Sequence, residues 1–299
     1  MKQIIALAKK ELLSFFSTPI ALIFIGTYLL VSLFVFFWVE GFFSRNIADV
    51  RPLFDWLPLL MVFLVSALTM RMWSEERRSG TLEFLFTGPI PVTSLVLGKF
   101  LACLALIALA LLLTLPLPIT VSMIGDLDWG PIFGSYLAAL LLASAYISVG
   151  IFVSARTDNQ IVSLMFTILI CMVMYLVGSE KFTGILSFEV ADFFRFLGTG
   201  SRFESITRGV IDIRDLYYYV SVSGLFLALN CLSLERLRWS KQGNKSLHKT
   251  WTLAVFLLGA NLIAANFWLD RVSFIRADLT TGNLYSISPA TKDVISKLQ

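Results

Sequence analysis

The stretch that decides the fold covers residues 74–86 and reads SEERRSGTLEFLF. It carries charges of both signs and lies between two apolar runs, residues 56–72 and 95–124, which approach or exceed the roughly 20 residues that cross a bilayer. Good helix formers and an apolar flank predict a helix that ends at Gly88-Pro89. Such a helix fits a groove on a soluble partner or the membrane surface, and the residues alone leave both open beside a plain solvated connector.

The rest of the chain is apolar as well. Of its 299 residues, 57% are hydrophobic and 15% are charged, and the mean hydropathy is +0.81. A soluble domain is about one quarter charged, so the composition predicts an all-α polytopic membrane protein. All seven tryptophans lie at or just beyond the ends of apolar runs, where indole prefers the membrane interface. The predicted spans are Ile20–Val39, Trp56–Met72, Leu95–Ile124, Ile132–Ser154, Ile161–Gly178, Leu216–Leu234 and Trp251–Leu269.

Positive charge fixes the expected orientation. With the N-terminus inside, thirteen Lys and Arg residues fall on inside segments, whereas the short outside loops hold only Arg45 and Arg51. This bias predicts a cytoplasmic N-terminus and, after seven spans, an extracytoplasmic C-terminus. The same asymmetry explains the pI of about 9.0 without nucleic-acid binding.

Residues 1–19 form a separate prediction. Ile4, Ile5, Ala8, Leu12, Phe15 and Phe16 can share one helical stripe opposite three lysines. We expect an amphipathic helix lying flat on the cytoplasmic face of the membrane, with Pro19 marking the turn into the first span. The alternative is one long first helix.

The spans lack the groups that would power or catalyse a reaction. None of the first six has an ionisable residue near its centre, which argues against an ion-coupled transporter. Lys99 follows Gly98 without the glycine spacing of a phosphate loop, and no catalytic or metal-binding constellation is apparent. We therefore expect a protein that is not an enzyme and draws energy from a partner.

Pro116 and Pro118 predict a kink in the outer half of the third span.

Residues 73–83, followed by Pro89-Ile90 and Leu97-Gly98-Lys99, resemble the hallmark of ABC-2-type transporter permeases. The resemblance covers about residues 1–240. It implies a six-span core over residues 20–235 in the bacterial inner membrane, a homodimer, and a coupling helix seated in a cleft of a cytoplasmic ABC ATPase. ATP and Mg then bind to that partner, and the permease itself binds no cofactor. The residues implied for ATPase contact are Glu75, Glu76, Arg77, Arg78, Gly80, Thr81, Leu82 and Glu83.

A second motif, FESITRGVIDIRD at residues 203–215, resembles permeases of the gliding-motility and copper-enzyme-maturation subgroup. The loop before the sixth span, residues 179–215, is too apolar for free solution. The resemblance implies short re-entrant helices that form an external gate, and a small external cap is the alternative. The candidate gate residues are Phe203, Arg208, Gly209, Asp212, Arg214 and Asp215.

The C-terminal part exceeds a six-span permease. A basic linker (236–250) leads to a seventh span (251–270) and then to residues 271–299, which resemble the start of the auxiliary, extracytoplasmic component of gliding-motility systems. Asp278-Leu279-Thr280 predicts a strand or turn, and Ser288-Pro289 predicts a helix over 290–298. We expect a fusion to that component, within a chain that continues past residue 299; the alternative is a simple membrane anchor.

Two functions remain open from the sequence. The first is an ABC-2 permease that couples ATP hydrolysis by its partner to export or conformational work. The second is a mechanotransmission scaffold that carries ATPase motion to envelope partners without moving a substrate. A continuous path lined by the second and fifth spans would favour the permease, and a sealed apolar interface would favour the scaffold. A third function, a passive channel, is disfavoured because the spans lack a polar stripe.

Overall fold

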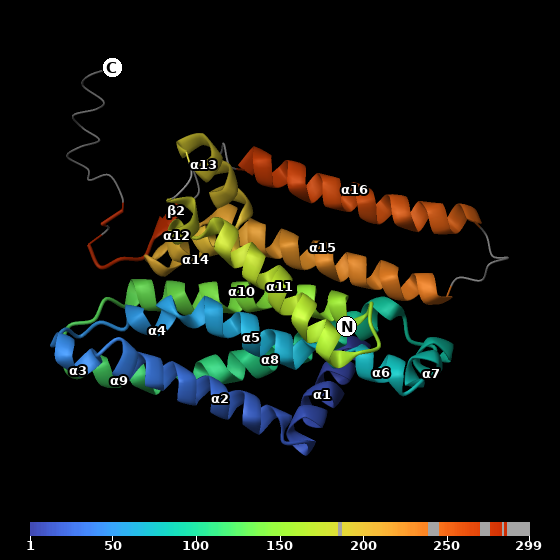
Figure 1. The fold of residues 1–299 in the computed structure, drawn as a ribbon, viewed down its shortest axis with the longest axis horizontal. Helices are drawn as coiled ribbons and strands as arrows, with labels where there is room; N and C mark the ends of the chain where they lie inside the picture. Colours follow the sequence, from blue (N-terminus) through green and yellow to red (C-terminus); the bar gives the residue numbers. More distant parts are fainter. Residues whose placement is uncertain (185–186, 239–244, 270–275, 283, 286–299) are drawn as a thin grey trace.

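A computed structural model describes residues 1–184, 187–238, 245–269, 276–282 and 284–285 (Figure 1). In this part of the chain, seven helices are long and apolar enough to cross a membrane. The prediction of an all-α polytopic protein is confirmed. The spanning elements are α2 (Ile20–Phe34) continuing into the π-helix η1 (Val35–Val39), α5 (Leu57–Thr69), α8 (Val92–Leu112), α10 (Trp129–Ser154), α11 (Gln160–Gly178), α15 (Ile213–Arg238) and α16 (Lys245–Leu269).

Shorter elements lie at the two ends of this bundle. The end that carries α6 and α7 is called the α6–α7 end, and the opposite end, where β1 and β2 pair, is called the β1–β2 end (Figure 1). The short elements are α1 (Lys2–Ser17), α3 (Phe42–Arg45), α4 (Arg51–Asp55), α6 (Ser74–Arg78), α7 (Thr81–Thr87), α9 (Pro116–Ser122), α12 (Glu180–Thr183), α13 (Phe188–Leu197), α14 (Thr199–Thr207), β1 (Val210–Asp212) and β2 (Arg276–Asp278).

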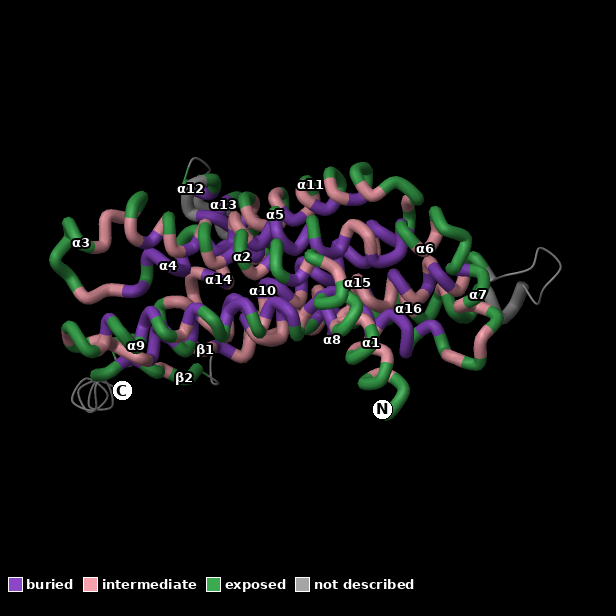
Figure 2. The backbone as a smooth tube through the Cα atoms, turned by 90° about the horizontal axis from the view of Figure 1, so that it is seen from below, coloured by how far each residue is buried: buried purple, intermediate pink, exposed green. Residues whose placement is uncertain are grey.

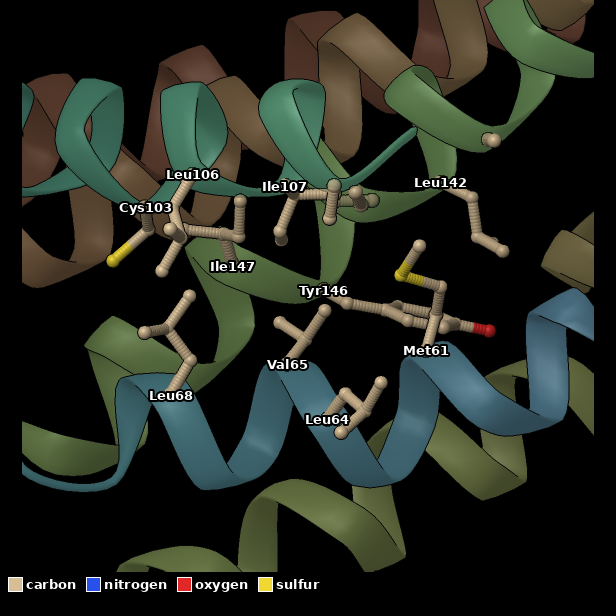
Figure 3. Packing of buried hydrophobic residues seen from close by; sticks show 14 of the residues in the cluster. Met61, Leu64, Val65, Leu68, Cys103, Leu106, Ile107, Leu142, Tyr146 and Ile147 are labelled. Carbon is tan, nitrogen blue, oxygen red and sulfur yellow. The ribbon is translucent and has the colours of Figure 1, made fainter. Parts of the chain in front are cut away.

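Helix α10 forms the centre of the bundle. In the apolar part of its span 72% of residues are buried, against 11% for α16, which packs mainly on α15 (Figure 2). Side chains of α5, α8 and α10 interdigitate at the core (Figure 3). Gly150 allows α5 to approach closely, because a Cβ there would lie 2.0 Å from the Thr69 hydroxyl oxygen. These core helices therefore approach each other closely through a small residue.

The polar residues of α5 and α11 take part in this packing. Thr69 and Thr167 are fully buried and donate hydrogen bonds to carbonyls of their own helices, those of Val65 and Ser163 respectively. In the single chain these two hydroxyl groups therefore serve helix packing and do not line an open path.

Proline breaks the third span as predicted. The helix α8 ends at Leu112, and α9 begins at Pro116, with Pro118 in its first turn. Because Pro lacks an N–H and clashes with the preceding turn, a continuous helix over this stretch is disfavoured.

Helix α1 is separate from α2, so the alternative of one long helix is wrong: Thr18 has extended backbone between them. Of the stripe predicted to face the membrane, Ile5, which is 63% exposed, and Phe16 remain exposed. Phe15 is buried, and a Cβ on Gly98 of α8 would lie only 2.7 Å from the Leu7 Cβ. Thus α1 packs on α8 through a close helix–helix contact, and part of its predicted membrane face is protein-facing.

Helices α13 and α14 enter the bundle at the β1–β2 end. The Thr199 hydroxyl oxygen, at the turn between them, lies 3.1 Å from the hydroxyl oxygen of Tyr146, well inside α10. The Tyr219 hydroxyl of α15 donates to the Thr199 carbonyl at 2.8 Å. Farther along α14, a Cβ on Gly134 would lie 2.5 Å from the Ile206 carbonyl oxygen. Helix α14 therefore packs against α10, α11 and α15, and the re-entrant gate and the external cap both stay predictions.

Candidate functional site

The charged segment of residues 74–86 folds as two short helices, not one. Gly80 has φ of +73°, in the left-handed region that favours glycine, and separates α6 from α7. The prediction of a single helix up to Gly88 is therefore wrong, because the left-handed Gly80 ends α6 and turns the chain into α7. The segment is a bent surface at one end of the bundle (Figure 1).

Ser154, the last residue of α10, holds the start of α6. Its Oγ accepts hydrogen bonds from the backbone N–H groups of Trp73 (3.0 Å) and Ser74 (3.2 Å) and donates to the Met70 carbonyl (2.9 Å). These are the N–H groups that a helix start leaves without an intrahelical partner. One buried hydroxyl therefore fixes α6 to the central helix.

Arg77 makes a second attachment to the same region. Its Nη1 donates to the Ala155 carbonyl at 2.8 Å, and its Nε lies 2.6 Å from the Asp158 carboxylate in the connection between α10 and α11. Arg77 therefore points into the protein and is not available to a partner in this arrangement.

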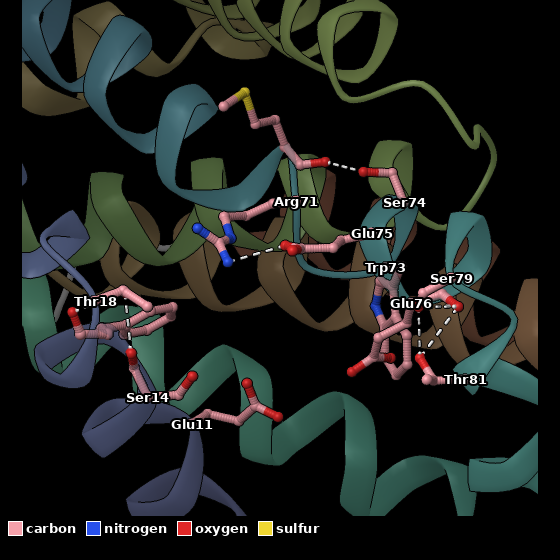
Figure 4. A network of polar contacts seen from close by, with 12 residues as sticks. Glu11, Ser14, Thr18, Arg71, Trp73, Ser74, Glu75, Glu76, Ser79 and Thr81 are labelled. Atoms are coloured by element: carbon pink, nitrogen blue, oxygen red, sulfur yellow. Dashed lines mark hydrogen bonds and ion pairs between the residues drawn. The ribbon is translucent and has the colours of Figure 1, made fainter.

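Glu76 also points inward, toward Lys99 of α8. The Lys99 ammonium lies 2.7 Å from the Glu76 carboxylate and 3.3 Å from that of Glu11 in α1, and only 4% of its side chain is exposed. It also lies 4.9 Å from the ring centre of Trp73. Figure 4 shows Glu11, Glu76 and Trp73 facing one another across the junction. This buried charge cluster of Glu11, Glu76 and Lys99 joins α1, α6 and α8.

Trp73 corrects one sequence interpretation. Its side chain is completely buried, and its indole N–H has no hydrogen-bond partner among the described residues. It packs inside the protein rather than anchoring the membrane interface, because the ammonium of Lys99 occupies the face of its ring.

The surface that remains exposed is narrower than the sequence predicted. Of the eight candidate contact residues, Glu76, Arg77 and Leu82 point inward, whereas Glu75, Arg78, Gly80, Thr81 and Glu83 are exposed. Phe84 is 79% exposed and was not among the candidates. Its position was readable from the sequence: with Leu82 and Leu85 on the packed side of a helix, the spacing places Phe84 on the other side.

At the β1–β2 end, the predicted gate residues split into core and ion-pair roles. Phe203 is buried, Arg208 is exposed, and Gly209 has φ of +88° at the turn into β1. Asp212 accepts hydrogen bonds from the Arg214 N–H (3.0 Å) and Nε (2.8 Å). Burial raises the pKa of Asp212, but the hydrogen bonds from Arg214 outweigh burial and hold that pKa below its ordinary value.

Asp215 has a partner that the sequence did not indicate. The Arg202 Nη1 lies 2.8 Å from its carboxylate, and the guanidinium is within 5.4 Å of the ring centres of Phe196 and Tyr218. Arg202 is the residue directly before the quoted motif, on α14, and the fold brings it to Asp215 on α15.

The C-terminal strand pairs with the gate motif. In the antiparallel pair, Ile211 of β1 lies opposite Ala277 of β2, and the Leu279 N–H donates to the Gly209 carbonyl at 2.9 Å. Gly130 is needed beside it, because a Cβ there would lie 1.9 Å from the Leu279 carbonyl oxygen. The prediction of a strand or turn at Asp278–Thr280 is confirmed, but its pairing with residues 210–212 was not foreseen.

A turn follows β2. The Asp278 carboxylate accepts hydrogen bonds from the Thr280 N–H and hydroxyl and from the Tyr285 N–H, and the Thr280 hydroxyl lowers the pKa of Asp278 below its ordinary value, with the backbone N–H groups adding to the effect. Asp128, which caps α10, accepts from the Thr281 hydroxyl at 3.0 Å. The predicted helix at 290–298 lies outside the described residues.

Within the described part of the chain, no group of three or more His, Cys, Asp or Glu residues could hold a metal ion. What the arrangement offers is mechanical: a bent, mixed-charge surface on α6–α7 that is tied to α1, α8 and α10.

Comparison with protein families gives one match over most of the chain. The model of a family described as ABC-2 family transporter protein matches residues 54–279, from α4 through β2. A comparison with curated proteins gave no match.

Proposed function

The chain belongs to the ABC-2 family of transporter proteins and is a multi-pass permease component, and on this basis we propose that it couples ATP hydrolysis by a separate ATPase to export or conformational work across the bacterial inner membrane. In this proposal, the α6–α7 end faces the cytoplasm and the β1–β2 end faces outward. ATP and Mg bind to the ATPase. The bias of positive residues toward the α6–α7 side of the spans supports this orientation.

The observation that carries the proposal is the exposed surface of α6 and α7 on a fixed base. Phe84 offers a large apolar side chain among Glu75, Arg78 and Glu83. Exposed aromatics with charged neighbours are typical of the centre and rim of protein interfaces. Helix α6 is the fixed base of this surface. Ser154 and Arg77 connect it to α10 and the residues after α10, and Lys99 connects it to α8 and α1. A push on α6 is therefore transmitted into the bundle, and α7 is joined to α6 by the Thr81 hydroxyl, which donates to the Glu76 carbonyl at 3.3 Å.

We further propose a homodimer that engages two ATPase subunits. The outer surfaces of α2–η1 and α11 support the dimer, because both expose large apolar side chains. More than half of each of these residues is exposed: Leu30 of α2, Trp38 of η1, and Met165 and Leu169 of α11. A second copy, like lipid, would cover these apolar side chains.

The test is co-purification of the ABC ATPase with the tagged chain. Charge reversal in Arg78→Glu changes the exposed surface without touching the buried charge cluster, so we expect the amount of bound ATPase to fall at least severalfold. Arg51→Glu makes the same charge change at the opposite end, where the side chain is 68% exposed, and serves as the control. Equal ATPase recovery with both variants would rule out α6–α7 as the contact.

The pairing of β2 supports the second candidate function, a scaffold that transmits motion. Because β2 pairs with the gate motif, movement of residues 208–212 would carry the segment after α16 with it. A scaffold that transmits ATPase motion to an extracytoplasmic auxiliary region, without translocating a substrate, uses this connection. An assay of substrate movement that stays negative while ATP-driven displacement of β2 is observed would favour the scaffold over the transporter.

A further inference from the structure

A polar cavity of about 400 Å³ lies at the β1–β2 end between α13, α14 and α15. Each of these helices contributes an arginine to its lining: Arg195, Arg202 and Arg214. Ser201 and Ser205 add hydroxyl groups, and Asp215 is the one acidic residue among the described lining residues. The coupling proposal assigns no role to this cavity.

Counted over the described residues, the arginines of the cavity outnumber the carboxylates that pair with them. Arg214 is paired with Asp212, and Arg202 is paired with Asp215 at 2.8 Å. Arg195 donates its Nε to the Thr183 hydroxyl at 3.2 Å, and among the described residues it has no carboxylate partner. A guanidinium has five N–H donors in a planar fork that matches the oxygens of a phosphate group. The cavity therefore has donors and charge for one anion.

The surroundings place this cavity at a lipid interface. Helix α13 exposes Val190, Phe193 and Leu197, of which Phe193 is 53% exposed, while carrying Arg195 on the same short helix. Such an amphipathic helix fits the boundary between headgroups and acyl chains. Phe196 stacks on Phe267 of α16 with ring centres 4.7 Å apart.

The neighbouring end of α16 also indicates that the cavity lies at the depth of the membrane–water interface. Trp268, next to Phe267, is 67% exposed, and exposed indoles of spanning helices concentrate at the membrane–water interface. The arginines of the cavity then lie at the depth of the phosphate groups in the adjacent leaflet.

We propose that this cavity binds the phosphate of a phospholipid in the leaflet at the β1–β2 end. The headgroup phosphate contacts Arg195 and Arg202, and the acyl chains cover the exposed apolar residues of α13. A free phosphate ion satisfies only the first of these two features, which is why the lipid is the better fit. The inference is independent of ATPase docking, because none of its residues lies near α6 or α7.

The test is a binding titration of the full chain, purified in an uncharged detergent, with dihexanoyl phosphatidylglycerol. Parallel titrations use inorganic phosphate and dihexanoylglycerol, which separate the phosphate from the acyl chains. We expect saturable binding of the phospholipid, with both parallel probes at least tenfold weaker. Arg195→Gln should weaken phospholipid binding on the order of tenfold, because a hydrogen bond to a charged group is lost.

Two variants complete the experiment. Arg51→Gln removes an exposed arginine at the same end outside the cavity and should bind like the wild type, whereas Arg195→Lys keeps the charge and should retain part of the affinity. Equal binding by Arg195→Gln and Arg51→Gln would overturn the site. Inorganic phosphate binding as tightly as the phospholipid would overturn the lipid as its source, and dihexanoylglycerol doing so would overturn the role of the phosphate.

Discussion

The α6–α7 end and the β1–β2 end differ in what connects their parts. At the α6–α7 end, charged side chains join helices that are far apart in sequence, with Lys99 between Glu11 and Glu76. At the β1–β2 end, segments that are distant in sequence also contact each other through their backbones. Strand β2 pairs with β1, and Gly130 leaves room for the Leu279 carbonyl. The first kind of connection depends on complete charge pairing, and the second on the absence of a side chain. The α6–α7 end should therefore be sensitive to the loss of a charge, and the β1–β2 end to an added side chain as well as to loss of the Asp212 charge.

The largest effect is expected at the buried charge cluster. Lys99→Met leaves two carboxylates near each other without their cation, and breaking a buried ion pair costs about 3–5 kcal/mol. We expect a corresponding loss in the free energy of unfolding, measured in detergent. Lys9→Met on the exposed side of α1 is the control. The triple variant Glu11→Gln, Glu76→Gln, Lys99→Met should recover part of the loss, and equal stability of Lys99→Met and Lys9→Met would contradict the cluster's role.

A smaller effect is expected from one methyl group at the other end. Gly130→Ala forces the Leu279 carbonyl away, and overpacking of this kind costs about 1–3 kcal/mol. Spin labels at Ile211→Cys and Ala277→Cys, in a background in which the three native cysteines are alanine, report separation of the strands by electron paramagnetic resonance. Gly224→Ala, where a Cβ meets nothing within 4 Å, is the matched control. Unchanged label distances in Gly130→Ala would show that the contact does not hold the tail.

Acid should loosen the β1–β2 end. The pKa of Asp212 is lower in the folded protein than its ordinary value of 3.8, so its stabilising effect is present above that value and is lost as the pH falls through the folded-state pKa. Asp278 acts in the same direction through its hydrogen bonds to Thr280. The same spin-label pair should separate as the pH falls below about 3.8, and Asp212→Asn should reduce the pH dependence. A pH response that is identical in Asp212→Asn would assign it to other groups.

The smallest effect on stability is expected at Phe84. Because 79% of this residue is exposed, Phe84→Ala should change the free energy of unfolding by no more than about 0.5 kcal/mol. Leu82→Ala, on the packed side of the same helix, should cost clearly more. Equal losses from the two variants would show that Phe84 is packed in the folded protein and not part of a docking surface.

Much of the fold could be predicted from hydropathy and proline. Seven apolar runs became seven candidate spans, and Pro116 and Pro118 marked the break after α8. The break between α6 and α7 was missed although it had a sequence signal, because glycine is a poor helix former that often follows a helix end, and Gly80 adopts the left-handed backbone angle of that position. The π-helical turn of residues 35–39 had no sequence signal.

The candidate site was less predictable, since it depends on partners that are distant in sequence. Lys99 was counted among the cytoplasmic positive charges, yet it is buried between two carboxylates from α1 and α6. Exposure of Glu75 and burial of Glu76 follow from how α6 meets α8 and α10, which sequence periodicity over five residues cannot decide. The pairing of β1 with β2 joins residues separated by the whole of α15 and α16, so no local pattern indicated it.

The most direct measurement of the central claim, that α6–α7 is where the ATPase engages, is site-directed cross-linking. In a background in which the three native cysteines are alanine, single cysteines at Phe84, Arg51 and Ala277 are treated with a short thiol-to-amine cross-linker in the assembled complex. The account predicts a cross-link to the ATPase from position 84 and none from positions 51 and 277. A complex that forms normally but cross-links from position 51 or 277, and not from 84, would contradict it.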